Sequence, residues 1–263
     1  MIRFFLPGEG MEALLEKGCS FDPAVGSKIL TLLKAYGGNG PLYKAYVLQG
    51  ADGTPTGALG IFEGGGNLSA GPALDYDELA EFAQMSGLRF VFGSLHTACA
   101  LETRMGGELF TSPAMAYRGG MTGANTRGID FAPALRDVYR IIRDANPHFA
   151  EHNPFDLWLS YTTRLVRSGQ AVCCTLNKGH IPVATGGIYS TGVGVGVIAS
   201  IATLPGSQGK GYGRIITQCL VDRLLERGLT PTLFCREESL STYYGRMGFV
   251  ETGNWGHQHF EKA

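Results

Sequence analysis

A glycine-rich segment in the C-terminal half has the composition of an anion-binding loop. Residues 200–204 have strand-like composition, and Pro205-Gly206-Ser207 follows as a turn. Glycines at 209, 211 and 213 lead directly into an amphipathic pattern over residues 214–227. Without Cβ atoms, successive backbone N–H groups can approach a bulky anion, and the helix adds its free first-turn amides and positive dipole end. The segment is therefore predicted to hold a pyrophosphate.

Two common nucleotide-binding patterns do not describe this loop. A Walker loop would continue with Gly-Lys-Ser or Gly-Lys-Thr after four variable residues, and none follows here. A dinucleotide fingerprint would have unevenly spaced glycines and an acidic residue about twenty positions later, at the end of a second strand. The pyrophosphate is therefore expected to belong to another kind of ligand.

The loop resembles the Gln/Arg-x-x-Gly-x-Gly/Ala signature of the GNAT superfamily of acyl-CoA-dependent N-acetyltransferases. The matching residues are Gln208–Gly213, with Pro205 three positions before them. Further on, Pro231–Cys235 has the pattern of a buried strand, and Ser241–Phe249 resembles the family's last helix, which ends in Met-Gly-Phe here. The resemblance covers residues 131–260 and is strongest over 198–250.

The resemblance implies roles for specific residues. The strand residues Ile201, Ala202 and Thr203 would polarise the thioester carbonyl of acetyl-CoA and pair with its pantetheine arm. Tyr244 would protonate the departing thiolate, which suits a phenol with a pKa near 10; its neighbour Tyr243 is interpreted as a core residue. The pyrophosphate would be held by Gln208, Gly209, Lys210, Gly211, Tyr212, Gly213 and Arg214.

Two departures from the family pattern leave the general base unassigned. Many members carry a glutamate on the strand before the loop, but Val197–Ser200 holds no carboxylate, and Arg236–Ser239 lacks the family's frequent asparagine. The alternatives are a water chain or one of Glu237, Glu151 and His152.

The helix before the strands could line an acceptor pocket. Trp158 and Tyr161 lie where the family builds that pocket, although an aromatic stripe on a helix is more often core. Asp156 could attract a cationic amine, and an N-cap is its other interpretation.

Composition narrows the partners and the compartment. The 263 residues carry a formal net charge of −1, which gives no electrostatic reason to expect nucleic acid or an anionic membrane. Six cysteines without a Cys-x-x-Cys pair are interpreted as buried thiols of a cytoplasmic protein. His148 and His152 have helical spacing, and His257 and His259 share one strand face, but all are expected to be solvated, with no metal site.

The order of predicted elements suggests two related halves. The expected fold class is α+β: a mixed, mostly antiparallel twisted sheet flanked by helices, GNAT-like and in two tandem copies. We expect a degenerate or unrelated domain at residues 1–120 and the acetyltransferase domain at 121–263. In the first half, residues 63–70 are expected to interrupt the pattern where a third strand and loop would stand.

Together these observations predict an N-acetyltransferase. It would move an acetyl group from acetyl-CoA to a primary amine of a small molecule, by direct transfer in a ternary complex. The alternatives are a CoA-binding sensor or scaffold without turnover, and a different nucleotide binder that shares the loop. A homo-oligomer is compatible with the sequence.

Overall fold

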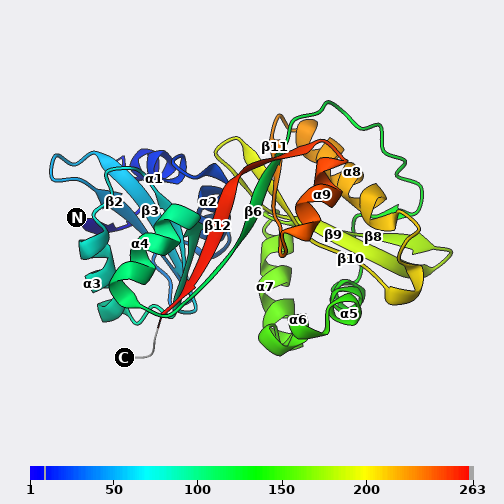
Figure 1. The fold of residues 1–263 in the computed structure, drawn as a ribbon, viewed down its shortest axis with the longest axis horizontal. Coiled ribbons are helices and arrows are strands. Elements are labelled where there is room, and N and C mark those ends of the chain that lie inside the picture. Colours follow the sequence, from blue (N-terminus) through cyan, green and yellow to red (C-terminus); the bar gives the residue numbers. More distant parts are fainter. Residues whose placement is uncertain (9, 261–263) are drawn as a thin grey trace.

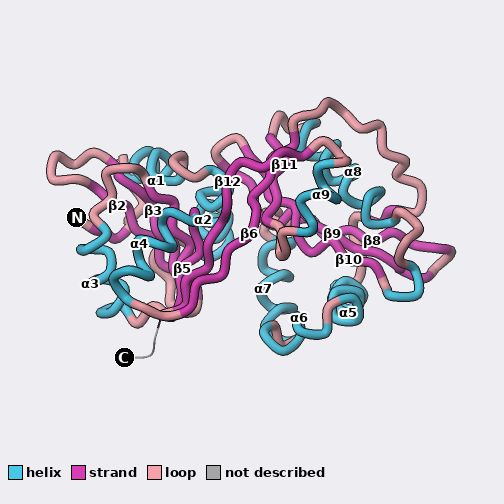
Figure 2. The backbone as a smooth tube through the Cα atoms, viewed as in Figure 1, coloured by secondary structure: helices cyan, strands magenta, loops and turns pink. Residues whose placement is uncertain are grey.

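A computed structural model describes residues 1–8 and 10–260 of the chain. All of its strands join one twisted sheet, flanked by helices on both faces (Figures 1 and 2). The strand order in that 12-stranded sheet is β1-β2-β3-β4-β5-β12-β6-β11-β10-β9-β8-β7. The mixed α+β architecture expected from the sequence is confirmed.

The first half contributes ten of these elements. They are β1 (Ile2–Phe4), α1 (Met11–Cys19), α2 (Pro23–Tyr36), β2 (Tyr43–Gln49), β3 (Pro55–Phe62), β4 (Gly65–Ala70), α3 (Tyr76–Ser86), β5 (Phe90–Ser94), α4 (Leu95–Met105) and β6 (Glu108–Tyr117). Capping side chains and glycines determine where several of these helices begin and end. The Asp22 side chain accepts a hydrogen bond from the backbone N–H of Val25 and caps α2, which then ends before Gly37 at φ 78°.

The second half repeats this order with one additional short helix. Its elements are β7 (Ile129–Asp130), α5 (Leu135–Ala145), α6 (Pro147–His152), α7 (Phe155–Arg167), β8 (Val172–Lys178), β9 (Ile181–Gly192), β10 (Val195–Thr203), the 3-10 turn η1 (Pro205–Ser207), α8 (Tyr212–Leu225), β11 (Thr230–Phe234), α9 (Ser239–Gly245) and β12 (Phe249–His259). The first helix of this half, α5, begins only at Leu135, because Ile129 and Asp130 before it pair with β8.

The two halves have the same topology, as the tandem hypothesis requires. In each, two antiparallel neighbours lead to a strand that pairs in parallel with the next one: β4 with β5, and β10 with β11. The prediction that residues 63–70 interrupt this pattern is wrong. Only Glu63 and Gly64 form the turn, and Gly65–Ala70 forms β4, since glycines at 65 and 66 leave room for Phe90 and Val91 of β5.

The last strand of each half lies beside the other half's sheet. β6, the end of the first half, pairs with β11 of the second, whereas β12, the end of the second half, pairs with β5 of the first. β6 and β12 also pair with each other along their whole length and cross the centre of the molecule (Figure 1). The predicted boundary near residue 120 falls between β6 and β7, and it stays a prediction because one sheet runs through both halves.

Helices also pack across the two halves. Leu165 of α7 is fully buried in a core cluster made mainly of first-half residues, including Leu15 and Ile29. The guanidinium of Arg164 donates a hydrogen bond of 2.7 Å to the carbonyl of Ala35 at the end of α2. The halves therefore share part of their core. Among the described residues, no helix combines the length and apolarity needed to cross a membrane.

Candidate functional site

β10 and β11 separate in the middle of the second half. They pair in parallel only from Val195 to Val197 of β10, and the last contact joins Val197 to Thr232. A bulge follows at Ser200, whose φ of 57° lies in the left-handed region that residues with a side chain rarely adopt. Beyond Val197, β10 is therefore paired only with β9, and its other edge faces the gap between β10 and β11.

The glycine loop stands at the end of that open edge. Gly209 and Gly211 both have positive φ values, 75° and 76°, and Gly211 is the N-cap of α8. Within the described part of the chain, no group accepts a hydrogen bond from the backbone N–H groups of residues 209–214. Because free amides at a helix N-terminus carry partial positive charge, these six donors form a site for an anion.

Side chains around the loop add positive charge and fix its shape. The amide of Gln208 donates to the carbonyl of Thr203 at 3.3 Å, which ties the loop to β10, and the ammonium of Lys210 donates to Gly206. The ring of Tyr212 lies under the ammonium of Lys178, 4.8 Å away. The structure thus brings the predicted residues from Ile201 to Arg214 together along β10, the loop and the first turn of α8.

Tyr243 lies at this loop, not in the core. Its side chain is 39% exposed, and a Cβ atom placed on Gly213 would lie 3.1 Å from its hydroxyl oxygen. The same Cβ position lies near Ile201 and Thr203 of β10. The interpretation of Tyr243 as a core residue is therefore wrong, because the first turn of α8 has no side chain at Gly213 and the phenol occupies that space.

Tyr244 is the buried member of the pair. It is 9% exposed and packs with Met247 and Phe249 in the apolar cluster that also contains Ile198 of β10. Burial, and then the neighbouring Tyr243, raise the pKa of Tyr244 above its usual value. The phenol is therefore protonated at physiological pH, and it can donate a proton but not act as a base.

The opposite face of the separated strands is covered by α2 of the first half. The hydroxyl groups of Ser27 and Ser190 lie 2.9 Å apart, and Ser190 pairs with Val197, where β10 and β11 part. The ammonium of Lys28 lies 4.7 Å from the ring centroid of Phe234, the last residue of β11. Sequence analysis missed both α2 residues, although a lysine beside the apolar positions Val25 and Ile29 was the available signal.

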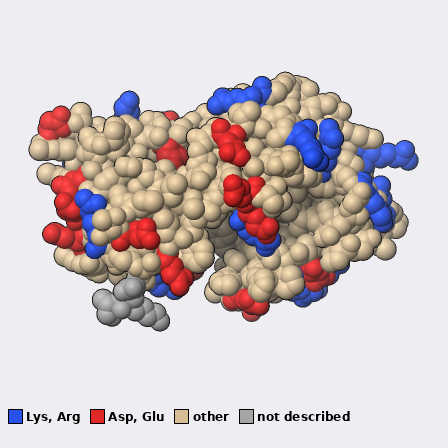
Figure 3. Space-filling model, in the orientation of Figure 1, with Lys and Arg blue, Asp and Glu red and all other residues tan. Residues whose placement is uncertain are grey.

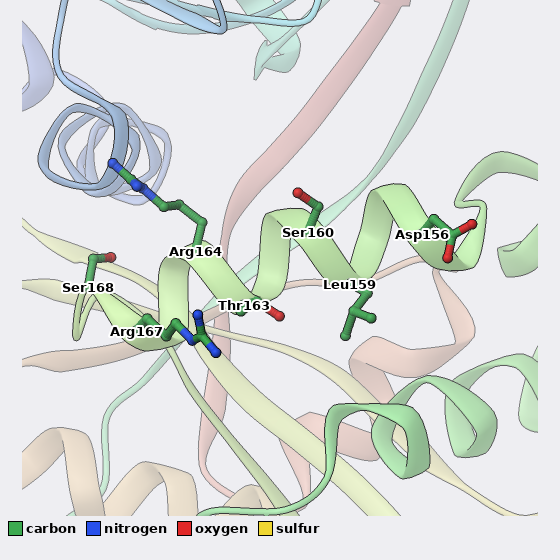
Figure 4. Close-up of a pocket in the computed structure, with 7 residues that line it drawn as sticks. All are labelled: Asp156, Leu159, Ser160, Thr163, Arg164, Arg167 and Ser168. Atoms are coloured by element: carbon green, nitrogen blue, oxygen red, sulfur yellow. The ribbon is translucent and has the colours of Figure 1, made fainter.

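The two aromatic residues of helix α7 lie in different surroundings. Trp158 is 8% exposed and packs in a core cluster with Tyr139. Tyr161 lies edge-on to Phe62 and lines, with Phe62 and Tyr36, a hollow of about 390 Å³ beside α7. A second hollow of about 630 Å³ lies along α7 (Figure 4). Its lining residues are Asp156, Leu159, Ser160, Thr163, Arg164, Arg167 and Ser168. The N-cap interpretation of Asp156 is wrong, since Pro154 occupies that position and leaves the carboxylate in the first turn.

The predicted base candidates lie on exposed surface. Glu237 contacts the guanidinium of its neighbour Arg236, and Glu151 lies 3.1 Å from His148 on α6. Nδ1 of His152 donates a hydrogen bond to the carbonyl of His148, one turn before it. Each of the three side chains contacts a group within four residues of it in the sequence, and the structure does not select a base among them.

The histidines of the two predicted pairs differ in exposure. Among the residues described, no group of three histidine, cysteine or acidic side chains could hold a metal ion. The expectation that His257 is solvated is wrong: its Nε2 atom is buried without a hydrogen-bond partner, and the ring packs 4.6 Å from that of Phe90. Burial, His259 and Lys28 lower the pKa of His257 to about 4.

Helix α3 of the first half corresponds to α8, and a carboxylate already occupies its N-terminus. The carboxylate of Asp75 accepts hydrogen bonds of 3.0 Å from the backbone N–H groups of Asp77 and Glu78 in the first turn of α3. Two further carboxylates thus stand in the first turn, and that of Glu78 binds the N-terminal ammonium. These carboxylates disfavour a phosphate at this end of α3, so of the two corresponding helix starts that of α8 is the one open to an anion.

A family comparison covers the part of the chain that holds this site. Residues 135–249 match the model of the acetyltransferase (GNAT) family. The matched range begins at α5 and ends at the first residue of β12, so it includes the separated strands, the loop and Tyr244. Comparison with curated proteins gives no match.

Solved structures with the same fold span the whole chain. A GCN5-related N-acetyltransferase from Sphaerobacter thermophilus has 16% identity and a TM-score of 0.61, over 100% of this chain and 96% of that one. A tandem GNAT protein from the clavulanic acid biosynthesis pathway has 12% identity and a TM-score of 0.58, over 100% and 99%. An acetyltransferase of the GNAT family from Colwellia psychrerythraea has 14% identity and a TM-score of 0.57, over 99% and 100%. At these identities the likeness concerns the fold alone.

Proposed function

This chain carries a GNAT acetyltransferase domain at residues 135–249, and from that premise we propose that it transfers an acetyl group from acetyl-CoA to a primary amine of a small molecule. The observation that supports the proposal most is the row of unpartnered backbone N–H groups at residues 209–214. A pyrophosphate supplies the oxygens that these donors need, and Lys210 and Arg214 add charge at the rim.

In this proposal the open edge of β10 receives the rest of the co-substrate. Backbone groups at Ile201, Ala202 and Thr203 would pair with the amides of the pantetheine arm, as another strand would. A backbone N–H directed at the thioester oxygen stabilises the charge that develops there when an amine attacks. Donors fixed in a sheet need no reorganisation during the reaction, so this part of the site is preorganised.

Tyr244 would supply the proton for the departing thiolate. The amine nitrogen forms a bond to the carbonyl carbon and loses a proton to water. The carbon–sulfur bond then breaks, and the electron pair leaves with sulfur, which takes a proton from the Tyr244 phenol. Because burial keeps the Tyr244 phenol protonated, the proton is available at the pH of the cell. No nucleophile is assigned to a covalent intermediate, so transfer is direct, within a complex of both substrates.

The proposal also places the protein in the cytoplasm. All six cysteines are free in the described residues, and five of them are buried. Such thiols suit a reducing compartment.

A sensor or scaffold that binds CoA without turnover is the second candidate. The absence of a carboxylate in Val197–Ser200 favours it, since no side chain there could accept the proton of the amine. The protonated phenol of Tyr244 favours the enzyme. Turnover with any amine in a panel, measured as release of free CoA thiol, separates the two candidates.

The binding test is calorimetric titration of the purified protein with acetyl-CoA. Gly211→Glu places a carboxylate at the start of α8 and is expected to abolish detectable binding. Gly228→Glu is a matched control: Gly228 also has positive φ, 68°, lies just beyond the other end of α8, and has open space around its Cβ position. Loss of binding in Gly211→Glu alone supports the proposal, whereas wild-type protein that does not bind acetyl-CoA overturns it.

A further inference from the structure

The sheet face under α2 carries an unusual group of side chains. Phe92 of β5, Trp255 of β12 and Phe234 of β11 lie together, with the Phe92 ring centroid 4.9 Å from Phe234 and 5.3 Å from Trp255. These strands come from both halves, and the exchange of β6 and β12 brings them together. We call this group, with Lys28, Ser112 and His257, the junction cluster.

Lys28 is the charged member of the junction cluster. Its ammonium lies 3.6 Å from the ring centroid of Phe92 and 4.7 Å from that of Phe234, so two aromatic faces hold it. Among the described residues, no carboxylate oxygen lies within 4.0 Å of it and no group accepts its hydrogen bonds. The acid that acts on its charge is Asp22, which caps the same helix.

Two neutral polar groups of the junction cluster are also unpartnered. Ser112 is 5% exposed, and its hydroxyl oxygen has no hydrogen-bond partner. Nε2 of His257 is also buried without a hydrogen-bond partner. Ser112 pairs with Trp255 across β6 and β12, and His257 pairs with Phe92, so their side chains share one face with Lys28 above it. Buried polar groups without partners cost free energy, which is why native proteins rarely keep them without a reason.

The position of the junction cluster relates it to the proposed acetyl transfer. α2 spans the point where β10 and β11 part: Ser27 contacts Ser190 on the β9 side, and Lys28 contacts Phe234 on the β11 side. The co-substrate site at α8 lies on the other face of the same strands. An amine that reaches the gap from the α2 face would therefore pass beside Lys28.

On this basis, and resting on the proposed function, we infer that the acceptor is an amine that also carries a carboxylate, and that Lys28 of the first half binds that carboxylate. The Lys28 ammonium and the Ser112 hydroxyl supply hydrogen-bond donors for the carboxylate. The aromatic rings of the junction cluster suit an apolar side chain on the carbon that joins the amine and the acid. Such a role gives the first half a direct part in substrate choice. Amino acids have this chemistry.

Charge supports the same assignment. Burial lowers the pKa of Lys28 to about 8, while Asp22 opposes that shift. The groups that face it from the packed elements are Asp22 on α2 and His257 on β12, and His257 is neutral at physiological pH because its pKa is about 4. A bound carboxylate would restore the charge that burial disfavours, so binding is expected to weaken as the pH rises above about 8.

The test compares matched ligands in the wild type and in Lys28→Met. The substrates are amino acids and the corresponding amines without the carboxylate, for example phenylalanine and phenethylamine, with CoA release as the readout. The wild type is expected to prefer the acid by about 10- to 100-fold in kcat/KM, the range of a charge-assisted hydrogen bond. Lys28→Met should remove that preference, and Lys34→Met, an exposed lysine on the same helix, should keep it.

A binding measurement keeps the inference testable without turnover. Trp255 lies in the junction cluster, so its fluorescence should change when N-acetyl amino acids, the expected products, are added, and should not change with their carboxamides. If the acids bind to the wild type but not to Lys28→Met while no amine is acetylated, the carboxylate site at Lys28 stands, and the proposed acetyl transfer falls. If Lys28→Met retains the wild-type ratio of acid to amine, or no acid is acetylated or bound, the inference falls, even where acetyl-CoA binding and turnover of other amines persist.

Discussion

The hydroxyl oxygens of Ser27 and Ser190 lie 2.9 Å apart, and this contact joins α2 of the first half to β9 of the second at the level where β10 and β11 separate. Both side chains are buried. The contact therefore fixes the helix above the gap in the strands. The first half is therefore structurally part of the proposed site, although the N-terminus of its own helix α3 is occupied by carboxylates.

The second half alone should not fold. In a fragment of residues 121–263, β11 would lose its partner β6, and β12 would lose both β5 and β6. Unpaired edges and an exposed apolar cluster make such a fragment aggregate or remain unfolded, as circular dichroism and gel filtration would reveal. Co-expression with residues 1–120 should restore a complex that binds acetyl-CoA. A soluble, folded fragment with full affinity would contradict this.

Replacing Tyr244 by phenylalanine should slow chemistry without weakening binding. The variant loses the proton donor, so kcat is expected to fall by about 10²-fold or more, with KM for acetyl-CoA nearly unchanged. Tyr243→Phe is the control next to it. Its hydroxyl lies at Gly213 beside the loop, so its removal should act on KM for acetyl-CoA and leave kcat close to the wild-type value. The reverse pattern in steady-state kinetics would assign the acid to Tyr243.

Removing the carboxylate that fills the first half's helix start should affect stability alone. Asp75→Ala leaves the amides of Asp77 and Glu78 without their cap, which costs about 1 kcal/mol of unfolding free energy. Denaturant unfolding would measure that loss. Calorimetry should still give one acetyl-CoA per chain, because Asp77 and Glu78 keep the first turn acidic. A stoichiometry of two would mean that Asp75 alone blocks a second site.

The loop was predictable from sequence because its chemistry is local. Glycines at 209 and 211 need positive φ whatever the rest of the fold does, and the helix that follows them is encoded in the next residues. Topology was predictable too, since the element order repeats. Only the interruption at 63–70 was misplaced, because a strand rich in glycine lacks the β-branched pattern on which a strand assignment depends.

The junction cluster could not be predicted, because it depends on contacts far apart in the chain. Lys28 and Phe234 meet only because the final strands β6 and β12 are exchanged between the halves, and nothing in either local sequence indicates that exchange. The two tyrosines show the same limit on a smaller scale. Which of Tyr243 and Tyr244 faces the loop depends on how α9 rests on β12, not on their order in the motif.

His257 should make the protein sensitive to acid. Its pKa is about 4 in the fold, below the usual 6.5, because of burial, His259 and Lys28. Between these two pH values the unfolded chain binds more protons than the folded one, so stability falls as the pH falls through this window, by about 1–3 kcal/mol. His257→Phe, which suits the neighbouring ring of Phe90, should flatten the pH dependence of the urea midpoint between pH 6.5 and 4. His180→Phe, at an exposed position in the turn between β8 and β9, should leave it steep, and equal slopes in all three proteins would show that His257 is not the group that titrates.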